Sequence, residues 1–203
     1  MSQLDGSVSL INIVLEPESI NPLFSTNLVF DGTNNNLHIN QIKSPKCNYG
    51  FQKSMLEDEI LRTSNHAIVR VTKVIDFNFT LFTNWIIDLK NNKEIFAIVD
   101  LKMAPVWIED LIDFLNMLIT NPQTGIYHVS SSYDISYYDA ISYIARKIDL
   151  NLNLIYPIKA IDKNINYNMN FSNLLIDKNK ENVFKKISPY NSIDNFLKFN
   201  NLD

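Results

Sequence analysis

The sequence predicts an α/β fold with a mainly parallel sheet. Short apolar runs rich in β-branched residues alternate with longer segments in which apolar side chains recur at helical spacing. Strands that alternate with helices of this length are typical of a parallel sheet, because each crossover between parallel strands carries a helix. A hydrophobic content of 46% over 203 residues is enough for a sizeable core in one domain, or one and a half.

The predicted strands are short apolar runs that end at turn residues or polar residues. They cover residues 8–15, 23–30, 67–75, 95–99, 126–130 and 154–158. Pro17 and Pro22 separate the first run from the second, and the gap between the two runs is only a few residues long. Because a parallel crossover needs about a dozen residues, the usual helix does not fit between these two strands.

The predicted helices are the segments with an amphipathic pattern. They cover residues 49–62, 80–89, 108–119, 136–147, 177–186 and 192–199. In the first helix we expect the apolar side chains at positions 55, 56, 60 and 61 to pack inward and the acidic run at 57–59 to face solvent. Ser136 is a plausible N-cap for the fourth helix, and the Asn-rich residues 162–173 are predicted to be a loop.

Composition and charge exclude several classes of protein. The formal net charge of −4 disfavours a nucleic-acid partner, which needs clustered Lys and Arg. No apolar run approaches the ~20 residues of a membrane span, and no signal peptide is visible at the N-terminus. The single cysteine, Cys47, has no partner for an internal disulfide, which fits a reducing compartment. The three histidines are scattered and predict no metal site, so we expect a cytoplasmic protein without a metal.

Chemistry is suggested by the segment Tyr49-Gly50-Phe51-Gln52-Lys53. A tyrosine four residues before a lysine places both side chains on one face of a helix, where the ammonium can stabilise a phenolate. A hydroxyl from the neighbouring strand, at Ser25 or Thr26, would complete a small proton-donating site. Tyr143 and Lys147 have the same spacing, but no Ser-Thr strand lies at the right distance before them. We interpret that second pair as part of a solvated helix face.

Five segments between residue 23 and the C-terminus together form a recognisable pattern. They are S-T-N-L-V-F-D-G at 25–32, Y-G-F-Q-K at 49–53 after Ser44-Pro45, I-V-R-V-T at 68–72, D-L-K-M-A-P-V-W at 100–107 before Asp110-Leu111, and G-I-Y-H-V at 125–129. In order and spacing they resemble the motifs of the dTDP-4-dehydrorhamnose reductase family of extended short-chain dehydrogenases/reductases. One such motif would be a weak signal, whereas five in order are a strong one.

The resemblance implies a partial Rossmann-type parallel sheet with a small C-terminal α/β substrate-binding region. Residues 1–100 would form a residual Rossmann-like catalytic half. Residues 101–203 would form a sugar-nucleotide-binding region with strands that interleave with the sheet. The family belongs to dTDP-rhamnose and polysaccharide biosynthesis.

The resemblance also implies the chemistry of the site. In the family, NADPH or NADH delivers hydride to a 4-keto group on a nucleotide-linked sugar, and the protein supplies orientation and a proton. Carried over, Tyr49 is the general acid, Lys53 stabilises its phenolate and holds the nicotinamide ribose, and Thr26 hydrogen-bonds the carbonyl oxygen. Tyr49 and Lys53 are therefore also the expected cofactor contacts. The expected substrate contacts are Ser25, Lys73, Pro105 and Trp107.

The sequence departs from the family at the cofactor's pyrophosphate. The family binds it on a glycine-rich turn that opens a helix. The glycines of this chain are Gly6, Gly32, Gly50 and Gly125, and none of them can form such a motif. We therefore expect an N-terminally truncated family member that lacks the glycine-rich βαβ half. Specificity for dTDP-rhamnose is put in doubt by Asn27 and Leu28, which stand where the family has Asp and Tyr.

The sequence has the expected general acid Tyr49 and Lys53 but no glycine-rich loop. Three interpretations follow from this combination. The first is a sugar-nucleotide reductase remnant, which is either a truncated product or is completed by another chain. The second is a non-catalytic sugar-nucleotide-binding or regulatory module, and the third is a degenerate interaction protein. All three leave a sheet edge uncovered, so we expect a homo-oligomer or a partner chain to cover it.

Overall fold

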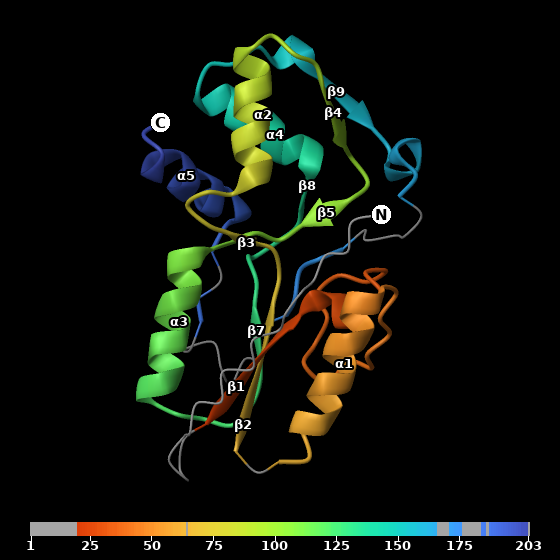
Figure 1. Ribbon diagram of the computed structural model, residues 1–203, viewed down its shortest axis with the longest axis vertical. Coiled ribbons are helices and arrows are strands. Elements are labelled where there is room, and N and C mark those ends of the chain that lie inside the picture. The colour runs from red at the N-terminus through yellow and green to blue at the C-terminus, as the bar shows by residue number, and fades with distance from the viewer. Residues whose placement is uncertain (1–19, 64, 166–170, 176–183, 186, 203) are drawn as a thin grey trace, which may run out of the picture.

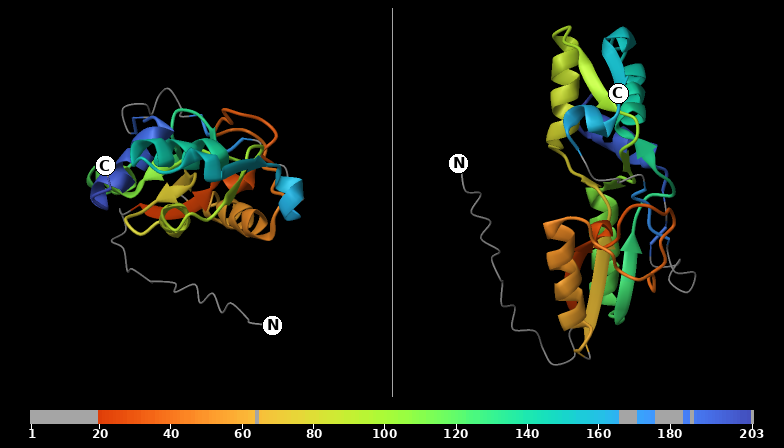
Figure 2. Two further views of the ribbon diagram at one scale, coloured as in Figure 1. Left: turned by 90° about the horizontal axis from the view of Figure 1, so that it is seen from above. Right: turned by 90° about the vertical axis from the view of Figure 1, so that its right-hand side faces the viewer.

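The computed structural model describes residues 20–202 except 64, 166–170, 176–183 and 186. The described chain forms two regions stacked along the long axis of the molecule (Figures 1 and 2). The predicted strand at 8–15 lies outside the described residues. So does nearly all of the predicted helix at 177–186.

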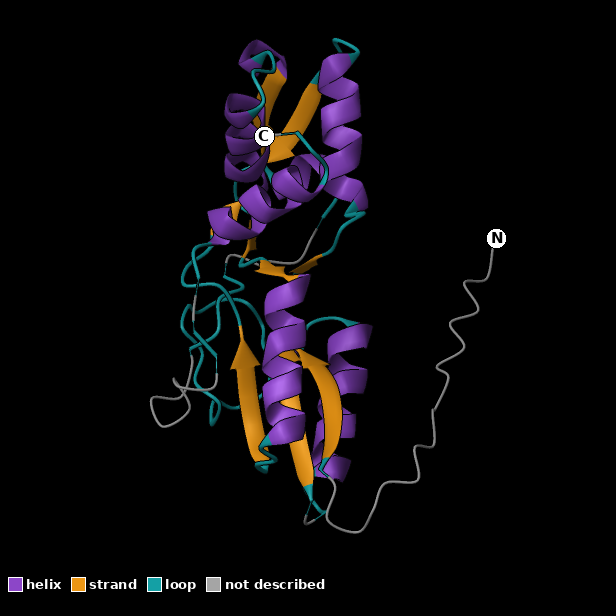
Figure 3. Cartoon of the chain, turned by 90° about the vertical axis from the view of Figure 1, so that its left-hand side faces the viewer, coloured by secondary structure: helices purple, strands orange, loops and turns teal. Residues whose placement is uncertain are grey.

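The lower region is a parallel sheet with helices on both faces. Strands β1 (Asn21–Thr26), β2 (His66–Val71) and β7 (Gly125–Val129) follow the order β1-β2-β7, and both pairings are parallel. Helix α1 (Asn48–Ile60) covers one face and α3 (Ile108–Thr120) covers the other (Figure 3). Side chains of β2 alternate between the two faces, so Ala67, Val69 and Val71 pack in the core beneath α3.

The upper region has a core of its own. Strands β4 (Ile95–Ile98) and β9 (Ile155–Ile158) pair in parallel. Three helices pack with them, namely α2 (Thr80–Lys90), α4 (Tyr137–Lys147) and α5 (Pro189–Phe199). Ser136 caps α4, with its side chain accepting from the Asp139 backbone N–H, as the sequence predicts.

Two short strand pairs lie between the regions. They are β3 (Val74–Ile75) with β6 (Val106–Trp107), which is parallel, and β5 (Lys102–Met103) with β8 (Ile135–Ser136), which is antiparallel. Short 3₁₀ turns complete the described elements: η1 (Asn27–Val29), η2 (Leu152–Leu154) and η3 (Ala160–Lys163). Both regions draw on both halves of the chain, because α2 and β4 lie above and α3 and β7 lie below (Figure 1). The two spatial regions thus each contain segments from before and after residue 100, and the functional division at this residue stays a prediction.

Two predicted strands are shorter in the structure than in the sequence pattern. The run at 23–30 leaves the sheet after Thr26, because the Thr26 hydroxyl accepts from the Leu28 backbone N–H and caps the 3₁₀ turn η1. The run at 67–75 divides into β2 and β3. The other predicted helices and strands that lie in the described residues agree with the structure to within a few residues, whereas the short strands β5, β6 and β8 were not predicted.

Helix α1 does not bury the apolar side that we predicted. In the acidic run at 57–59, Glu57 is buried instead, whereas Asp58 and Glu59 are exposed as expected. Gly50, Ser54 and Glu57 are its buried residues, whereas Met55 and Leu56 are 56% and 47% exposed. The prediction was wrong because it counted apolar side chains. The helix is held instead by a buried charge on β2.

That charge is Arg70, which forms a two-pronged ion pair with Glu57. Arg70 Nε donates to Glu57 Oε1 over 3.0 Å and Nη2 donates to Oε2 over 2.8 Å, and the two residues are 2% and 0% exposed. Ser25 on β1 donates to Glu57 Oε1 over 2.5 Å. Arg70 Nη1 donates to the Ile39 carbonyl over 3.1 Å. The pair therefore joins α1, β1, β2 and the loop before α1.

A histidine extends this network to β7. Arg70 Nη1 lies 3.3 Å from His128 Nε2, and His128 Nδ1 lies 2.9 Å from the Leu175 carbonyl. A guanidinium only donates hydrogen bonds, so His128 Nε2 accepts and Nδ1 carries the proton. His128 is thus a structural residue of the sheet.

We predict that Glu57→Gln destabilises the protein by about 3–5 kcal/mol, because it leaves the Arg70 charge buried without its partner. The matched control is Glu59→Gln on the same helix, which breaks an exposed pair with Arg62 and should cost no more than about 0.5 kcal/mol. Urea unfolding followed by circular dichroism measures both. Replacing both partners, as Glu57→Leu with Arg70→Met, should recover much of the loss. Equal and small losses of stability in Glu57→Gln and Glu59→Gln would contradict the role of the Glu57–Arg70 ion pair in holding α1.

Candidate functional site

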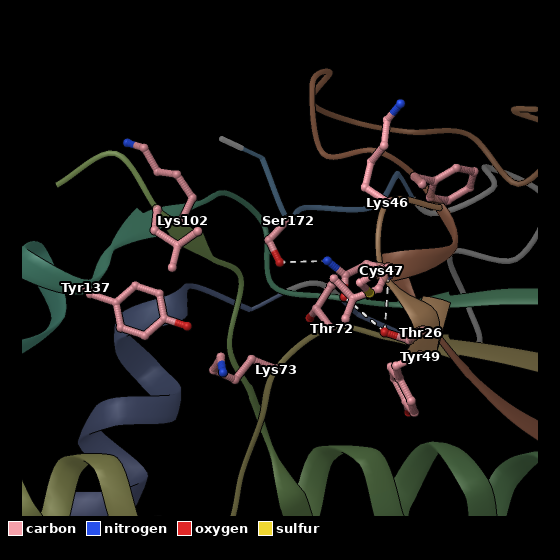
Figure 4. A pocket seen from close by; sticks show the side chains of 13 residues that line it. Thr26, Lys46, Cys47, Tyr49, Thr72, Lys73, Lys102, Tyr137 and Ser172 are labelled. Atoms are coloured by element: carbon pink, nitrogen blue, oxygen red, sulfur yellow. Dashed lines mark hydrogen bonds between the residues drawn. The ribbon is translucent and has the colours of Figure 1, made fainter. Parts of the chain in front are cut away.

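A pocket of about 420 Å³ opens between the two regions. It lies beyond the carboxyl ends of β1 and β2, which is where open α/β sheets bind ligands. Figure 4 shows the side chains that line it. They are Thr26, Asn27, Leu28, Phe30, Lys46, Cys47, Tyr49, Thr72, Lys73, Leu101, Lys102, Tyr137 and Ser172.

Thr26 and Tyr49, two of the predicted catalytic residues, both line this pocket. The Thr26 hydroxyl accepts from the Leu28 backbone N–H over 3.2 Å. The hydroxyl donates its own proton to Asn27 Oδ1 over 3.4 Å, which is long for a hydrogen bond. Tyr49 lies in the first turn of α1 and is 52% exposed. In Figure 4 its ring extends away from Thr26, with the hydroxyl at the far end. Thr26 therefore retains a proton that a ligand oxygen could accept.

Gly50 allows α1, which carries Tyr49, to lie close to the turn η1 that follows Thr26. A Cβ atom on Gly50 would lie 2.1 Å from the Leu28 carbonyl oxygen, so only a glycine lets α1 approach the backbone of η1 this closely. Cys47 is the N-cap of α1, and its sulfur accepts from the Gly50 backbone N–H over 3.4 Å. The start of α1, and with it Tyr49, is thus positioned by backbone contact.

Lys53 lies on the same face of α1 as Tyr49, as its spacing predicts. Its ammonium is 5.9 Å from the centre of the Tyr49 ring and donates to the Phe24 carbonyl of β1 over 2.8 Å. Lys53 is not among the residues that line the pocket. In this structure it ties α1 to the edge strand.

The predicted substrate contacts divide into one that lines the pocket and three that do not. Lys73 lines it, with its ammonium 5.7 Å from the centre of the Tyr137 ring. The hydroxyl of Ser25 is directed to Glu57 instead. Pro105 and Trp107 are buried; the Pro105 carbonyl accepts from a serine of α5, and Trp107 packs edge-on against Phe77. Ser25, Pro105 and Trp107 therefore support the walls of the site without facing it.

Several lining residues carried no signal in the sequence analysis. Lys46, Lys102, Tyr137 and Ser172 come from separate loops and elements, and only the tertiary fold brings them together. Ser172 is attached to the opposite wall, because Asn27 Nδ2 donates to its hydroxyl over 2.9 Å. No local motif could have revealed this contact, since 145 residues separate its partners.

The second tyrosine–lysine pair has a different environment. The Tyr143 hydroxyl donates to Asp194 Oδ1 over 2.8 Å, and Lys147 Nζ lies 3.1 Å from the same carboxylate. Burial, together with this carboxylate, raises the pKa of Tyr143, so its phenol stays a hydrogen-bond donor. The pair joins α4 to α5. It is more than a solvated helix face, but it takes no part in the pocket.

The described part of the chain has neither a metal-binding cluster nor a membrane-spanning helix. No group of His, Cys, Asp and Glu side chains within it could hold a metal ion. None of its helices is long and apolar enough to cross a membrane.

Comparison with known proteins matches the chain to one protein family and to several solved structures. A family model described as the RmlD substrate binding domain matches residues 23–197. No curated protein matches the chain. The described fold resembles the dTDP-4-dehydrorhamnose reductase of Bacillus anthracis, solved in complex with NADP, with a TM-score of 0.79 and 21% identity over 87% of this chain. The enzymes of Clostridium acetobutylicum and Yersinia enterocolitica match with TM-scores of 0.76 and 0.73, at 18% and 21% identity over 89% and 88% of this chain.

These matches confirm the predicted resemblance and the Rossmann-type α/β fold. The chain spans 64%, 65% and 66% of the length of the three solved reductases. At identities of 18–21%, the solved structures establish the fold alone.

We predict that Gly50→Ala displaces α1 from η1 and destabilises the protein by about 1–3 kcal/mol, because the added methyl group meets a backbone carbonyl. Thermal unfolding measures the loss. Since Cys47 is the only cysteine, its rate of reaction with a thiol reagent should change as well. Gln52→Ala, at an exposed position of the same helix, is the control and should change neither. An unaltered stability and thiol reactivity in Gly50→Ala would refute the role given to this contact.

Proposed function

Because the chain belongs to the RmlD substrate binding domain family, we propose that it is a dTDP-4-dehydrorhamnose-reductase-like protein whose pocket binds a nucleotide-linked sugar. The observation that carries the proposal is the convergence of Thr26, Tyr49 and Lys73 on one pocket beyond the strand ends. A volume of about 420 Å³ suits a ligand of this kind. The family match extends over 23–197 and so includes every residue that lines the pocket.

The chain's own residues suit a carbonyl on such a sugar. Thr26 has a hydroxyl proton that is held only by a long contact, and Tyr49 presents a half-exposed phenol from the adjacent wall. In the proposed complex, Thr26 donates a hydrogen bond to the carbonyl oxygen. If a nicotinamide held by other residues or another chain delivered hydride to the carbonyl carbon, Tyr49 would turn its hydroxyl toward this oxygen and supply the proton. Lys53 would have to leave the Phe24 carbonyl to support Tyr49 in this role.

The described residues do not fit the pyrophosphate of a nicotinamide dinucleotide. Such a group needs a glycine-rich turn between a strand and the N-terminus of a helix. Gly32 lies in the turn after η1, Gly50 packs inside α1 against Leu28, and Gly125 begins β7. A nicotinamide cofactor, if this chain uses one, would bind through residues beyond those described or through another chain.

A second candidate function is a non-catalytic sugar-nucleotide-binding or regulatory module that acts with a partner chain. Two observations favour it. Lys53 is occupied by the Phe24 carbonyl instead of facing the pocket. Strand β1 pairs only with β2 in the described sheet, which leaves its other edge for a partner or a second copy of the chain.

We predict that the isolated chain binds a dTDP- or UDP-linked sugar with a Kd of about 1–100 μM, measured by isothermal titration calorimetry. Tyr49→Phe should change this affinity by no more than about threefold, because a proton donor acts mainly in the transition state. Tyr156→Phe, on β9 and outside the pocket, is the matched control. Failure of every nucleotide-linked sugar to bind up to about 1 mM would overturn the proposal.

We further predict that the chain alone does not oxidise NADPH in the presence of 4-keto sugar nucleotides, because its described residues supply no turn for the pyrophosphate. Absorbance at the nicotinamide band measures this directly. Turnover by the chain alone that fell by about 100-fold or more in Tyr49→Phe would contradict this expectation. It would establish an autonomous reductase with Tyr49 as its acid.

A further inference from the structure

We propose that Lys46, Lys73 and Lys102 form a cationic clamp for the diphosphate group of the ligand. This inference rests on the proposed function and deepens it by assigning residues to one part of the ligand. Its starting point is a contrast in charge. The protein has a formal net charge of −4, yet the described lining of its pocket has three lysines and no aspartate or glutamate.

The three lysines are not neutralised by neighbours. In the described part of the chain, carboxylates lie within ion-pair distance of other cationic side chains: Lys43, Arg62, Arg70, Lys93 and Lys147. No described carboxylate pairs with Lys46, Lys73 or Lys102. Asp31 interacts with Lys46 only weakly: its pKa is lowered mainly by the Thr33 backbone N–H, with Lys46 as a minor cause. The pocket therefore presents free positive charge to a ligand.

The lysines surround the pocket from separate elements. Lys46 precedes α1, Lys73 lies between β2 and β3, and Lys102 belongs to β5. In Figure 4, Lys46 and Lys102 stand on opposite sides of the pocket, with Ser172 between them and Lys73 below. Each lysine carries its charge on a flexible four-carbon stem, so the three ammonium groups can turn toward one anion. In Figure 4 the ammonium groups of Lys46 and Lys102 point outward, so both would turn inward on binding. Charges of one sign around a cleft focus the field on an anionic ligand.

A hydroxyl is available to complete the clamp. Ser172 accepts from Asn27 Nδ2 over 2.9 Å, and its own proton has no described acceptor. It can therefore donate to a phosphate oxygen between the lysines. Thr72, by contrast, already donates to the Ala104 carbonyl.

The placement defines an orientation for the ligand. Thr26 would hold the sugar carbonyl on its side of the pocket, with Tyr49 on the adjacent wall, and Lys46, Lys73 and Lys102 would hold the diphosphate. A nucleoside diphosphate linkage carries two negative charges, which matches three lysines better than an uncharged sugar would. The assignment predicts that affinity depends on the diphosphate more than on the base.

The test is calorimetric titration of the full chain with dTDP, dTMP and inorganic pyrophosphate. We expect dTDP and pyrophosphate to bind, and dTMP to bind about tenfold more weakly than dTDP. Lys46→Ala and Lys102→Ala should each weaken dTDP binding by about 5- to 10-fold, and the double variant by about 50-fold, with a weaker dependence on salt. The matched control is Lys90→Ala, at the exposed end of α2. Thermal unfolding verifies that every variant is folded.

The outcomes separate this inference from the proposed function. If nucleotide-linked sugars bind and the lysine variants match Lys90→Ala, the clamp is overturned while the proposed function stands. If no nucleotide-linked sugar binds but pyrophosphate does, with loss in the lysine variants, the clamp is supported and the sugar-nucleotide function is overturned. If neither pyrophosphate nor dTDP binds, the clamp is overturned directly.

Discussion

The lower region depends on one buried ion pair, Glu57 with Arg70. Burying two charges costs several kcal/mol, and the cost is offset only when both ions are fully hydrogen-bonded. Here the carboxylate receives two bonds from the guanidinium and one from Ser25. The guanidinium also reaches the Ile39 carbonyl and His128, and it lies 5.0 Å from the centre of the Phe30 ring. Each partner belongs to a different segment, so satisfying the pair fixes how these segments meet.

The pocket inherits its geometry from this arrangement. Once Glu57 is anchored, α1 can rotate little about its axis, and its first turn lies against η1 where Gly50 touches the Leu28 carbonyl. Thr26 and Tyr49 then occupy adjacent walls beyond the strand ends. With Glu57 directed at Arg70, the apolar side of α1 faces outward, so Met55 and Leu56 are exposed. The orientation that places Tyr49 at the pocket therefore leaves Met55 and Leu56 in contact with solvent.

Much of the fold could be predicted because the spacing of apolar residues along the sequence indicates most of its helices and strands. The helices at 80–90, 108–120 and 137–147 follow their apolar stripes, and the sheet strands follow their β-branched runs. The orientation of α1 could not be predicted in this way, since a glutamate becomes a core residue only when an arginine on another element meets it. For the site, the family resemblance pointed to Thr26, Tyr49 and Lys73, which all line the pocket. It gave no side-chain direction for Ser25, Pro105 or Trp107, and it was silent on lysines that converge only in three dimensions.

The contact between Asn27 and Ser172 determines when, during synthesis and folding, the pocket can first bind a ligand. Its partners are 145 residues apart, so this wall of the pocket closes only after most of the chain has been synthesised. Closing so long a loop is entropically costly and slow compared with forming a helix. A ligand that touches both walls binds only after Asn27 and Ser172 have met, and its binding then stabilises this long-range contact in the folded protein.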